Sequence, residues 1–176
     1  MTKRIEKVDI KEGIHVTIKP YVDSSKQKML LFWLIAWSIC GVFIISQLFL
    51  EVNKDLKIPI FVFTVFWLYF EYLVIKVYRW RTTGLEQFLI TDSELHYGRT
   101  YNNRGLLTPY RKDMINRVRL VDGELNNFTK TFFQSYWVIG GERLAFTAGG
   151  KVIPFGLRLN DKEAKYVLKI INEQLN

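Results

Sequence analysis

The stretch that decides the fold is MLLFWLIAWSICGVFIISQLFL, residues 29–50, in which no residue carries a formal charge. A second apolar stretch, IPIFVFTVFWLYF at residues 58–70, is followed by Glu71 and then by four more uncharged residues. A run of about 18 or more apolar residues is typical of a helix that crosses a membrane. We therefore predict two spanning helices, at residues 29–50 and 58–77, which form a hairpin within residues 29–81. This pattern excludes an ordinary soluble enzyme.

Charge around the hairpin predicts its orientation. The 176-residue chain has 25 Lys and Arg against 17 Asp and Glu, a formal net charge of +8. The turn between the two helices is electrically balanced, whereas both outer flanks are basic. The flanking basic residues are Lys19, Lys26, Lys28, Lys76, Arg79 and Arg81. Because Lys and Arg mark the cytoplasmic side, we expect both termini in the cytoplasm of a bacterium, the hairpin in its inner membrane, and residues 1–28 as a cytosolic basic leader.

Residues 82–176 change to short alternating runs, which predict a cytosolic β-rich domain. The expected strands are 87–91, 94–101, 114–120, 131–139, 142–147 and 151–155. A helix is expected at residues 160–175, because Asn160 and Glu163 form a capping-box variant ahead of an apolar face at helical spacing. The predicted fold class is a membrane α+β protein: an N-terminal transmembrane hairpin, then a small β-barrel or sandwich with a C-terminal amphipathic helix.

Glu71 is the most informative polar residue of the second span. A carboxylate in hydrocarbon costs several kcal/mol, so it should face protein or water rather than lipid. Thr64, Trp67 and Glu71 share one helical stripe, which indicates a pore lining or a subunit interface. Two alternatives stay open: Glu71 pairs with Lys76 or Arg79 near the interface, or it is protonated.

The first span offers a matching face. Trp33, Trp37 and Gln47 lie on it, with the small residues Ala36, Cys40 and Gly41 between them, which would allow another helix to approach closely. This face serves either contact between copies or packing within the hairpin. Since two helices enclose no lumen, any pore requires a homo-oligomer around a symmetry axis.

No pattern in the sequence predicts catalysis, a metal or a cofactor. His15 and His96 have no companion ligands, and a zinc site needs about four ligands or three plus water. Cys40, the single cysteine, lies inside the first span. Neither a nucleophile elbow nor a phosphate-binding loop is present. We expect no catalytic residues, no metal and no cofactor, and we expect the protein not to be an enzyme.

A basic edge in the β-rich domain is the remaining candidate site. It consists of Arg111, Lys112, Arg117 and Arg119. Such an edge can attract anionic lipid head groups or RNA phosphates. The alternative is an ordinary solvated strand face. Direct nucleic-acid binding is compatible with the charge of the chain but is not required by it.

Two resemblances follow from this order of elements. The β-rich domain with its final helix looks like a pleckstrin-homology-like domain, as in bacterial two-helix-hairpin proteins that carry one. The whole chain also resembles, in size, charge and architecture, the small membrane accessory proteins of type VI-B, RNA-targeting CRISPR systems. That second resemblance implies a functional link to an RNA-guided ribonuclease and a homo-oligomeric pore that depolarises the membrane in antiviral defence.

The sequence thus leaves two main hypotheses of different class. The first is the inner-membrane pore of antiviral defence. The second is a membrane-anchored binding or scaffold module whose β-domain recognises lipid, a nucleotide or a protein.

Overall fold

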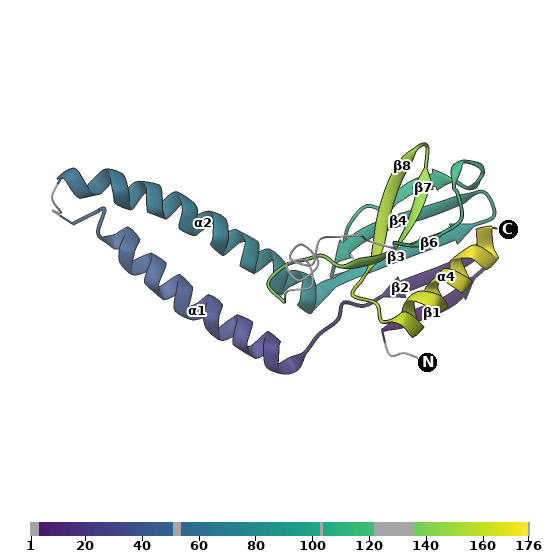
Figure 1. Ribbon diagram of the computed structural model, residues 1–176, viewed down its shortest axis with the longest axis horizontal. Coiled ribbons are helices and arrows are strands. Elements are labelled where there is room, and N and C mark those ends of the chain that lie inside the picture. The colour runs from purple at the N-terminus through teal and green to yellow at the C-terminus, as the bar shows by residue number, and fades with distance from the viewer. Residues whose placement is uncertain (1–3, 51–53, 103, 122–135, 176) are drawn as a thin grey trace. The chain divides into compact units, whose positions relative to one another are not determined.

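The computed structural model describes residues 4–50, 54–102, 104–121 and 136–175. The described chain divides into two compact units (Figure 1). Residues 22–79 together with Tyr136–Val138 form the first, here called the hairpin unit. The described residues up to Tyr21, from Trp80 to 121 and from Ile139 onward form the second, here called the β-unit.

Two long helices make up most of the hairpin unit. Helix α1 spans Ser24–Ser46 and helix α2 spans Lys54–Thr83. Helix α1 begins five residues before the predicted start because Asp23 caps it: its carboxylate accepts the backbone N–H of Ser25 and Lys26 at 3.1 and 3.2 Å. It ends before Leu50 because the next three N–H groups bond to carbonyls three residues back, which tightens the chain into turns.

Helix α2 is longer than the predicted 58–77 at both ends. Pro59 therefore lies inside the helix rather than in its first turn. Proline lacks an N–H, so one backbone hydrogen bond of the helix is missing there. The helix continues to Thr83, where the chain passes directly into the first strand that follows the hairpin.

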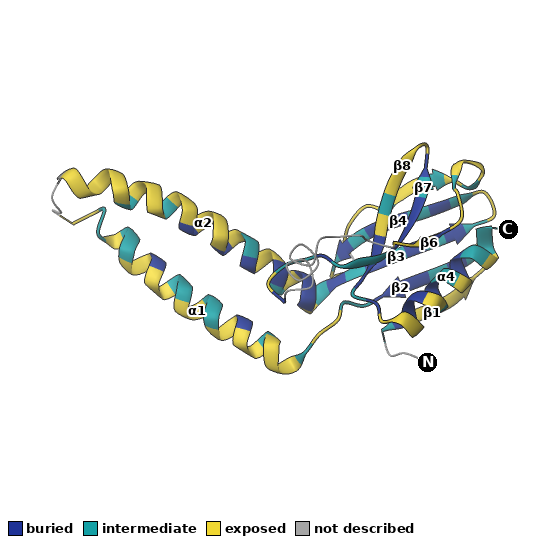
Figure 2. Cartoon of the chain, in the orientation of Figure 1, coloured by how far each residue is buried: buried dark blue, intermediate teal, exposed yellow. Residues whose placement is uncertain are grey.

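Both helices are long and apolar enough to cross a membrane. Most of their surface is exposed (Figure 2). The exposed side chains are large and apolar, among them Phe32, Ile35, Ile39, Val42, Phe43, Phe61, Val62, Val65, Phe66 and Leu68. An exposed apolar surface of this extent marks a site of contact with a membrane or another protein.

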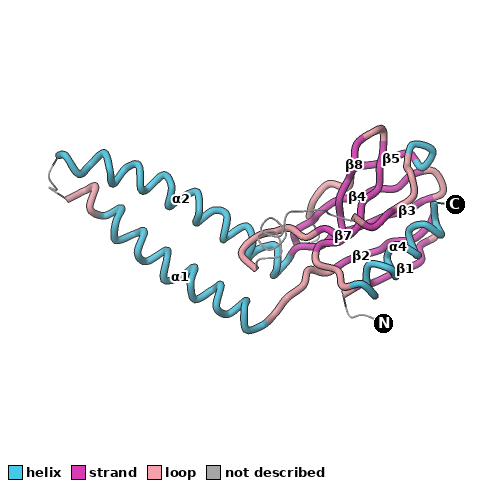
Figure 3. Tube along the Cα trace, viewed as in Figure 1, coloured by secondary structure: helices cyan, strands magenta, loops and turns pink. Residues whose placement is uncertain are grey.

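The β-unit contains two antiparallel sheets (Figures 1 and 3). The first has the order β1-β2-β3-β4-β5 and the second the order β6-β7-β8. Their bounds are β1 Ile5–Ile10, β2 Gly13–Ile18, β3 Gly84–Thr91, β4 Glu94–Tyr101, β5 Thr108–Arg111, β6 Arg119–Leu120, β7 Glu142–Ala148 and β8 Lys151–Leu157. Neither sheet closes on itself among the described strands, so the predicted barrel is not formed, whereas the predicted combination of sheet and C-terminal helix is present.

The leader is part of this fold, so the structure divides the chain differently from the predicted 1–28, 29–81 and 82–176. Strand β2 pairs antiparallel with β3, with Val16 opposite Phe88. Strand β1 then adds to the outer edge of β2. Strand β2 joins the sheet because its apolar residues alternate along the strand. Ile14, Val16 and Ile18 therefore share one face, on which they are buried. The two long helices are therefore an insertion between the second and third strands of a single sheet.

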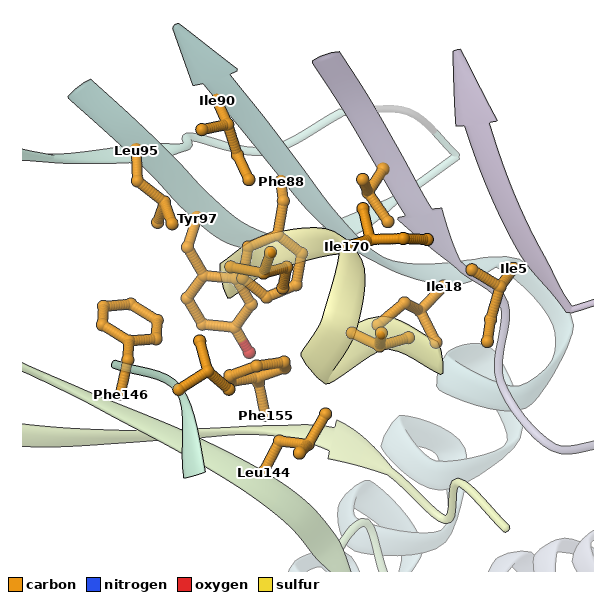
Figure 4. Packing of buried hydrophobic residues seen from close by; sticks show 14 of the residues in the cluster. Ile5, Ile18, Phe88, Ile90, Leu95, Tyr97, Leu144, Phe146, Phe155 and Ile170 are labelled. Atoms are coloured by element: carbon orange, nitrogen blue, oxygen red, sulfur yellow. The ribbon is translucent and has the colours of Figure 1, made fainter. Parts of the chain in front are cut away.

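The core of the β-unit is aromatic and aliphatic (Figure 4). Phe88 and Tyr97 from the first sheet meet Phe146 and Phe155 from the second, with ring centroids 4.8–6.1 Å apart. Helix α4, Asp161–Leu175, adds an apolar face to this core. It begins one residue after the predicted start. Its cap is the predicted box, in which the Asn160 and Glu163 side chains each accept the other's backbone N–H.

Two predicted strands differ from the structure. Within 114–120, only Arg119–Leu120 is a strand, and it follows a short 3-10 helix, η1, at Lys112–Met114. Of 131–139, residues 131–135 lie outside the described residues, and Tyr136–Ile139 forms turns and bends. Of these residues, Tyr136, Trp137 and Val138 belong to the hairpin unit, where the side chains of Tyr136 and Trp137 contact α1.

Candidate functional site

The polar centre of the hairpin unit is a contact between Ser38 of α1 and Glu71 of α2. Their Oγ and Oε1 atoms are 2.6 Å apart. Glu71 is only 9% exposed, although most residues of α2 are exposed. Its second oxygen, Oε2, is buried and has no hydrogen-bond partner among the residues that the structure describes. Glu71 thus faces the other helix of its own hairpin.

Indole packing surrounds this contact. Trp67, one turn before Glu71, is buried and donates its Nε1–H to the carbonyl of Trp37 at 3.3 Å. A Cβ atom at Gly41 would lie 1.9 Å from the Trp67 ring. Glycine is therefore the residue that lets α1 and α2 approach at this level. Of the predicted small-residue face, Gly41 is used within the hairpin, whereas Cys40 is exposed.

An aromatic cluster covers the beginning of α1. Trp33 stacks on Trp37 with centroids 5.1 Å apart. Trp137 meets Trp33 edge-on, also at 5.1 Å. Tyr136 beside it is buried and donates its hydroxyl to Oε1 of Gln27 at 2.9 Å. The segment 136–138, predicted as strand, thus packs on a helix, and alternation of aromatic residues gave no signal for that contact.

Two predicted members of the pore stripe lie apart from this centre. Thr64 donates its hydroxyl to the carbonyl of Ile60 in its own helix at 2.8 Å. Gln47 follows the last residue of α1, and its amide donates to the nearby Ser46 hydroxyl at 3.3 Å. The structure therefore brings together Glu71, Trp67 and Trp37, with Trp33 next to Trp37, and leaves Thr64 and Gln47 outside the contact.

The predicted basic edge is partly engaged in contacts within the chain. Arg111 donates to the carboxylate of Asp113 at 2.6 Å. Lys112 reaches the C-terminal end of α4, where it donates to the carbonyl of Gln174 at 2.6 Å. Arg117 and Arg119 are exposed. At least two of the four cations are thus engaged within the chain, which weakens the case for a lipid or RNA site built from all four.

The strongest polar network of the β-unit centres on Glu86, which the sequence analysis missed. Glu86 is 1% exposed. Its Oε1 accepts from the Tyr97 hydroxyl at 3.0 Å and from Nε of Arg99 at 3.1 Å. Its Oε2 accepts the backbone N–H groups of Gly156 and Leu157 at 2.9 and 3.0 Å. The alternation of the strand could have indicated this burial, because Glu86 lies an even number of residues before Phe88 and Ile90, which are buried on the same face of β3.

This network is saturated, so its role is to join the two sheets. Burial, followed by the nearby charge of Glu86, raises the pKa of Tyr97 above its usual range. Arg99 also donates to Glu142 of β7 at 3.0 Å. With four donors on one carboxylate, no oxygen of Glu86 is left for a reacting group. The arrangement is that of a structural ion pair rather than of a catalytic acid.

The described ranges contain no group of ligands typical of a metal centre. No group of three or more His, Cys, Asp or Glu side chains there is placed to hold a metal ion. His96 lies 3.0 Å from Glu94, far along the chain from His15. No family model, curated protein or solved structure matched this chain.

Proposed function

We propose that the chain is a membrane-anchored protein whose two long helices cross the bilayer as a hairpin and hold the β-unit at the membrane surface as a binding or scaffold module. One observation carries this proposal. The outward faces of α1 and α2 are apolar and exposed, while Ser38 and Glu71 face each other between the helices. A hairpin with this distribution meets lipid with its apolar side chains and keeps its costly carboxyl away from hydrocarbon.

The orientation rests on charge. Lys26, Lys28, Lys76 and Arg79 belong to the hairpin ends that lead to the β-unit, whereas Asp55 partly offsets the lysines at the opposite end. The excess of Lys and Arg favours the β-unit and both termini on the cytoplasmic side. In a bacterium, as the resemblances imply, the membrane would be the inner membrane. Two sheets with a C-terminal helix support a pleckstrin-homology-like architecture for the module.

The pore hypothesis receives less support from the same geometry. Its motivation was a polar stripe that would line a channel between copies. Glu71 and Trp67 are instead packed against Ser38, Trp37 and Gly41 of the same chain. To line a pore, they would have to leave these contacts. The homo-oligomeric, CRISPR-linked pore therefore stays a prediction from resemblance, together with its link to an RNA-guided ribonuclease.

Two assays on the full-length protein test the proposal. Membranes that contain it are washed with alkaline carbonate, which removes peripheral proteins. We expect the protein to stay in the membrane pellet, and its release into the wash would refute the anchor.

The second assay separates anchor from pore. Purified protein is reconstituted into liposomes with a trapped ion-sensitive dye. We expect ion leakage equal to that of empty liposomes. Leakage that increases with protein and changes in a Glu71→Gln variant would favour the pore instead.

A further inference from the structure

The Ser38 hydroxyl makes a second close contact besides the one with Glu71. The Ser38 hydroxyl oxygen lies 2.8 Å from the carbonyl oxygen of Leu34, one turn earlier in α1. The same oxygen lies 2.6 Å from Oε1 of Glu71. Both separations are ordinary hydrogen-bond lengths for O–H···O contacts.

One hydroxyl cannot supply both bonds. Serine has a single O–H hydrogen but two acceptor lone pairs, and a carbonyl oxygen can only accept. If the Ser38 hydrogen points to Leu34, the hydrogen between Ser38 and Glu71 must come from Glu71. If it points to Glu71 instead, two acceptor oxygens face each other 2.8 Å apart with no hydrogen between them. A protonated Glu71 supplies a separate hydrogen for each of the two contacts, which a carboxylate does not.

The other carboxyl oxygen supports the same assignment. Oε2 is buried and has no hydrogen-bond partner among the described residues. An unpartnered oxygen costs more on a charged carboxylate than on a neutral acid, where it is a carbonyl. Glu71 also forms no ion pair within the described part of the chain, in contrast to Glu86 and Glu163 of the β-unit, each of which has an arginine.

Among the described residues of α1 and α2 within two turns of this contact, the single charged side chain besides Glu71 is an exposed lysine. Within two turns of Ser38 on α1, Cys40 is the single titratable side chain, and it is exposed. Within two turns of Glu71 on α2, Tyr69, Tyr72 and Lys76 are exposed and Tyr78 is partly buried. The contact between the two helices is therefore built from apolar groups, indoles and this one carboxyl.

We propose that Glu71 is a proton-binding site of the hairpin. The carboxylic acid donates through Oε1 to Ser38, and Ser38 donates to the carbonyl of Leu34. Loss of the proton places a second acceptor against Ser38 and a charge between two apolar helices, so deprotonation opposes their contact. The closed hairpin is thus a proton-bound state. This inference goes beyond anchoring and stands on the hydrogen-bond geometry whether or not the helices span a bilayer.

Infrared spectroscopy of the full-length protein in lipid tests the proposal, because a protonated carboxyl has a carbonyl stretching band that a carboxylate lacks. At neutral pH, we expect this band in the wild type and its loss in Glu71→Gln, whose amide preserves shape. Labelling glutamate carboxyls with carbon-13 in the wild type should move the band to lower wavenumber, which assigns it to a glutamate, and the Glu71→Gln variant then assigns it to Glu71.

Ser38 provides the matched pair of controls. Ser38→Ala removes the acceptor of the acid proton, so the band should shift to higher wavenumber. Ser38→Thr keeps the hydroxyl and should leave the band close to its wild-type position. The proposal is overturned if the wild type at neutral pH shows only carboxylate bands for Glu71, or if Ser38→Ala leaves the carbonyl band where it was. Membrane extraction is a separate readout, so failure here does not imply failure of the anchor.

Discussion

The smallest side chain in the helix contact, that of Gly41, decides how closely α1 and α2 approach. A methyl group there would lie 1.9 Å from the Trp67 ring, far inside contact distance. We expect Gly41→Ala to destabilise the hairpin by about 1–3 kcal/mol, the usual cost of overpacking. Cys40→Ala is the matched control, because Cys40 directly precedes Gly41 and its own side chain is exposed. Equal unfolding free energies of both variants in mixed micelles would contradict this packing.

Glu86 provides the corresponding test in the β-unit. Glu86→Gln removes the charge that Arg99 needs and turns an amide N–H₂ toward donors, so we expect a loss of about 3–5 kcal/mol. Glu142→Gln removes the second, more exposed partner of Arg99 and should cost about 1 kcal/mol or less. Chemical denaturation of the full-length protein in detergent, followed by near-ultraviolet circular dichroism, measures both. Similar costs for the two variants would show that Glu86 does not join the sheets.

Tyr97 makes the stability of the β-unit depend on alkaline pH. Its pKa is raised by burial and by Glu86, so the folded state keeps the phenol proton where the unfolded state loses it. The stabilisation is complete below about pH 10, the unfolded value, and declines as the pH rises further. We expect Tyr97→Phe to lose less stability than the wild type between about pH 10 and 12. Parallel stability curves over that interval would be inconsistent with a buried phenol.

At the scale of the element, the segment 136–138 and the beginning of α1 form one aromatic contact. Trp137 packs edge-on against Trp33, with centroids 5.1 Å apart. A double-mutant cycle with Trp33→Ala and Trp137→Ala should give a coupling energy of about 0.5–1.5 kcal/mol, as for other aromatic pairs. Strictly additive losses of stability would mean that the segment does not pack on the helix.

Elements with a strong local signal were predicted well from the sequence. The two uncharged stretches predicted both long helices, because an apolar run of that length is typical of a helix long enough to cross a membrane. The Asn160–Glu163 box gave the start of α4 within one residue, because a cap is a local interaction. The segment 136–139 was assigned to the wrong element type, because aromatic residues favour strands on average and its actual partner lies about a hundred residues earlier.

At the scale of the molecule, no pattern in the sequence indicated that strands on either side of the hairpin share one sheet. The pairing of β2 with β3 joins residues separated by the entire hairpin. The contact of Ser38 with Glu71 is likewise a property of two helices together: Glu71 stood out in the sequence, but its partner did not. Residue type thus identified the carboxyl, and only the fold showed which side of the hairpin it faces.

We propose that α1 and α2 cross a membrane with the β-unit on the cytoplasmic side. Cysteine accessibility tests it most directly, because the single Cys40 can be replaced by serine to give a cysteine-free background. In that background, Lys57→Cys reports the turn of the hairpin and Lys169→Cys reports an exposed position on α4. In intact spheroplasts, a membrane-impermeant maleimide should label the first variant at once and the second only after permeabilisation. Labelling of both or neither before permeabilisation, or the reverse order, would contradict the account.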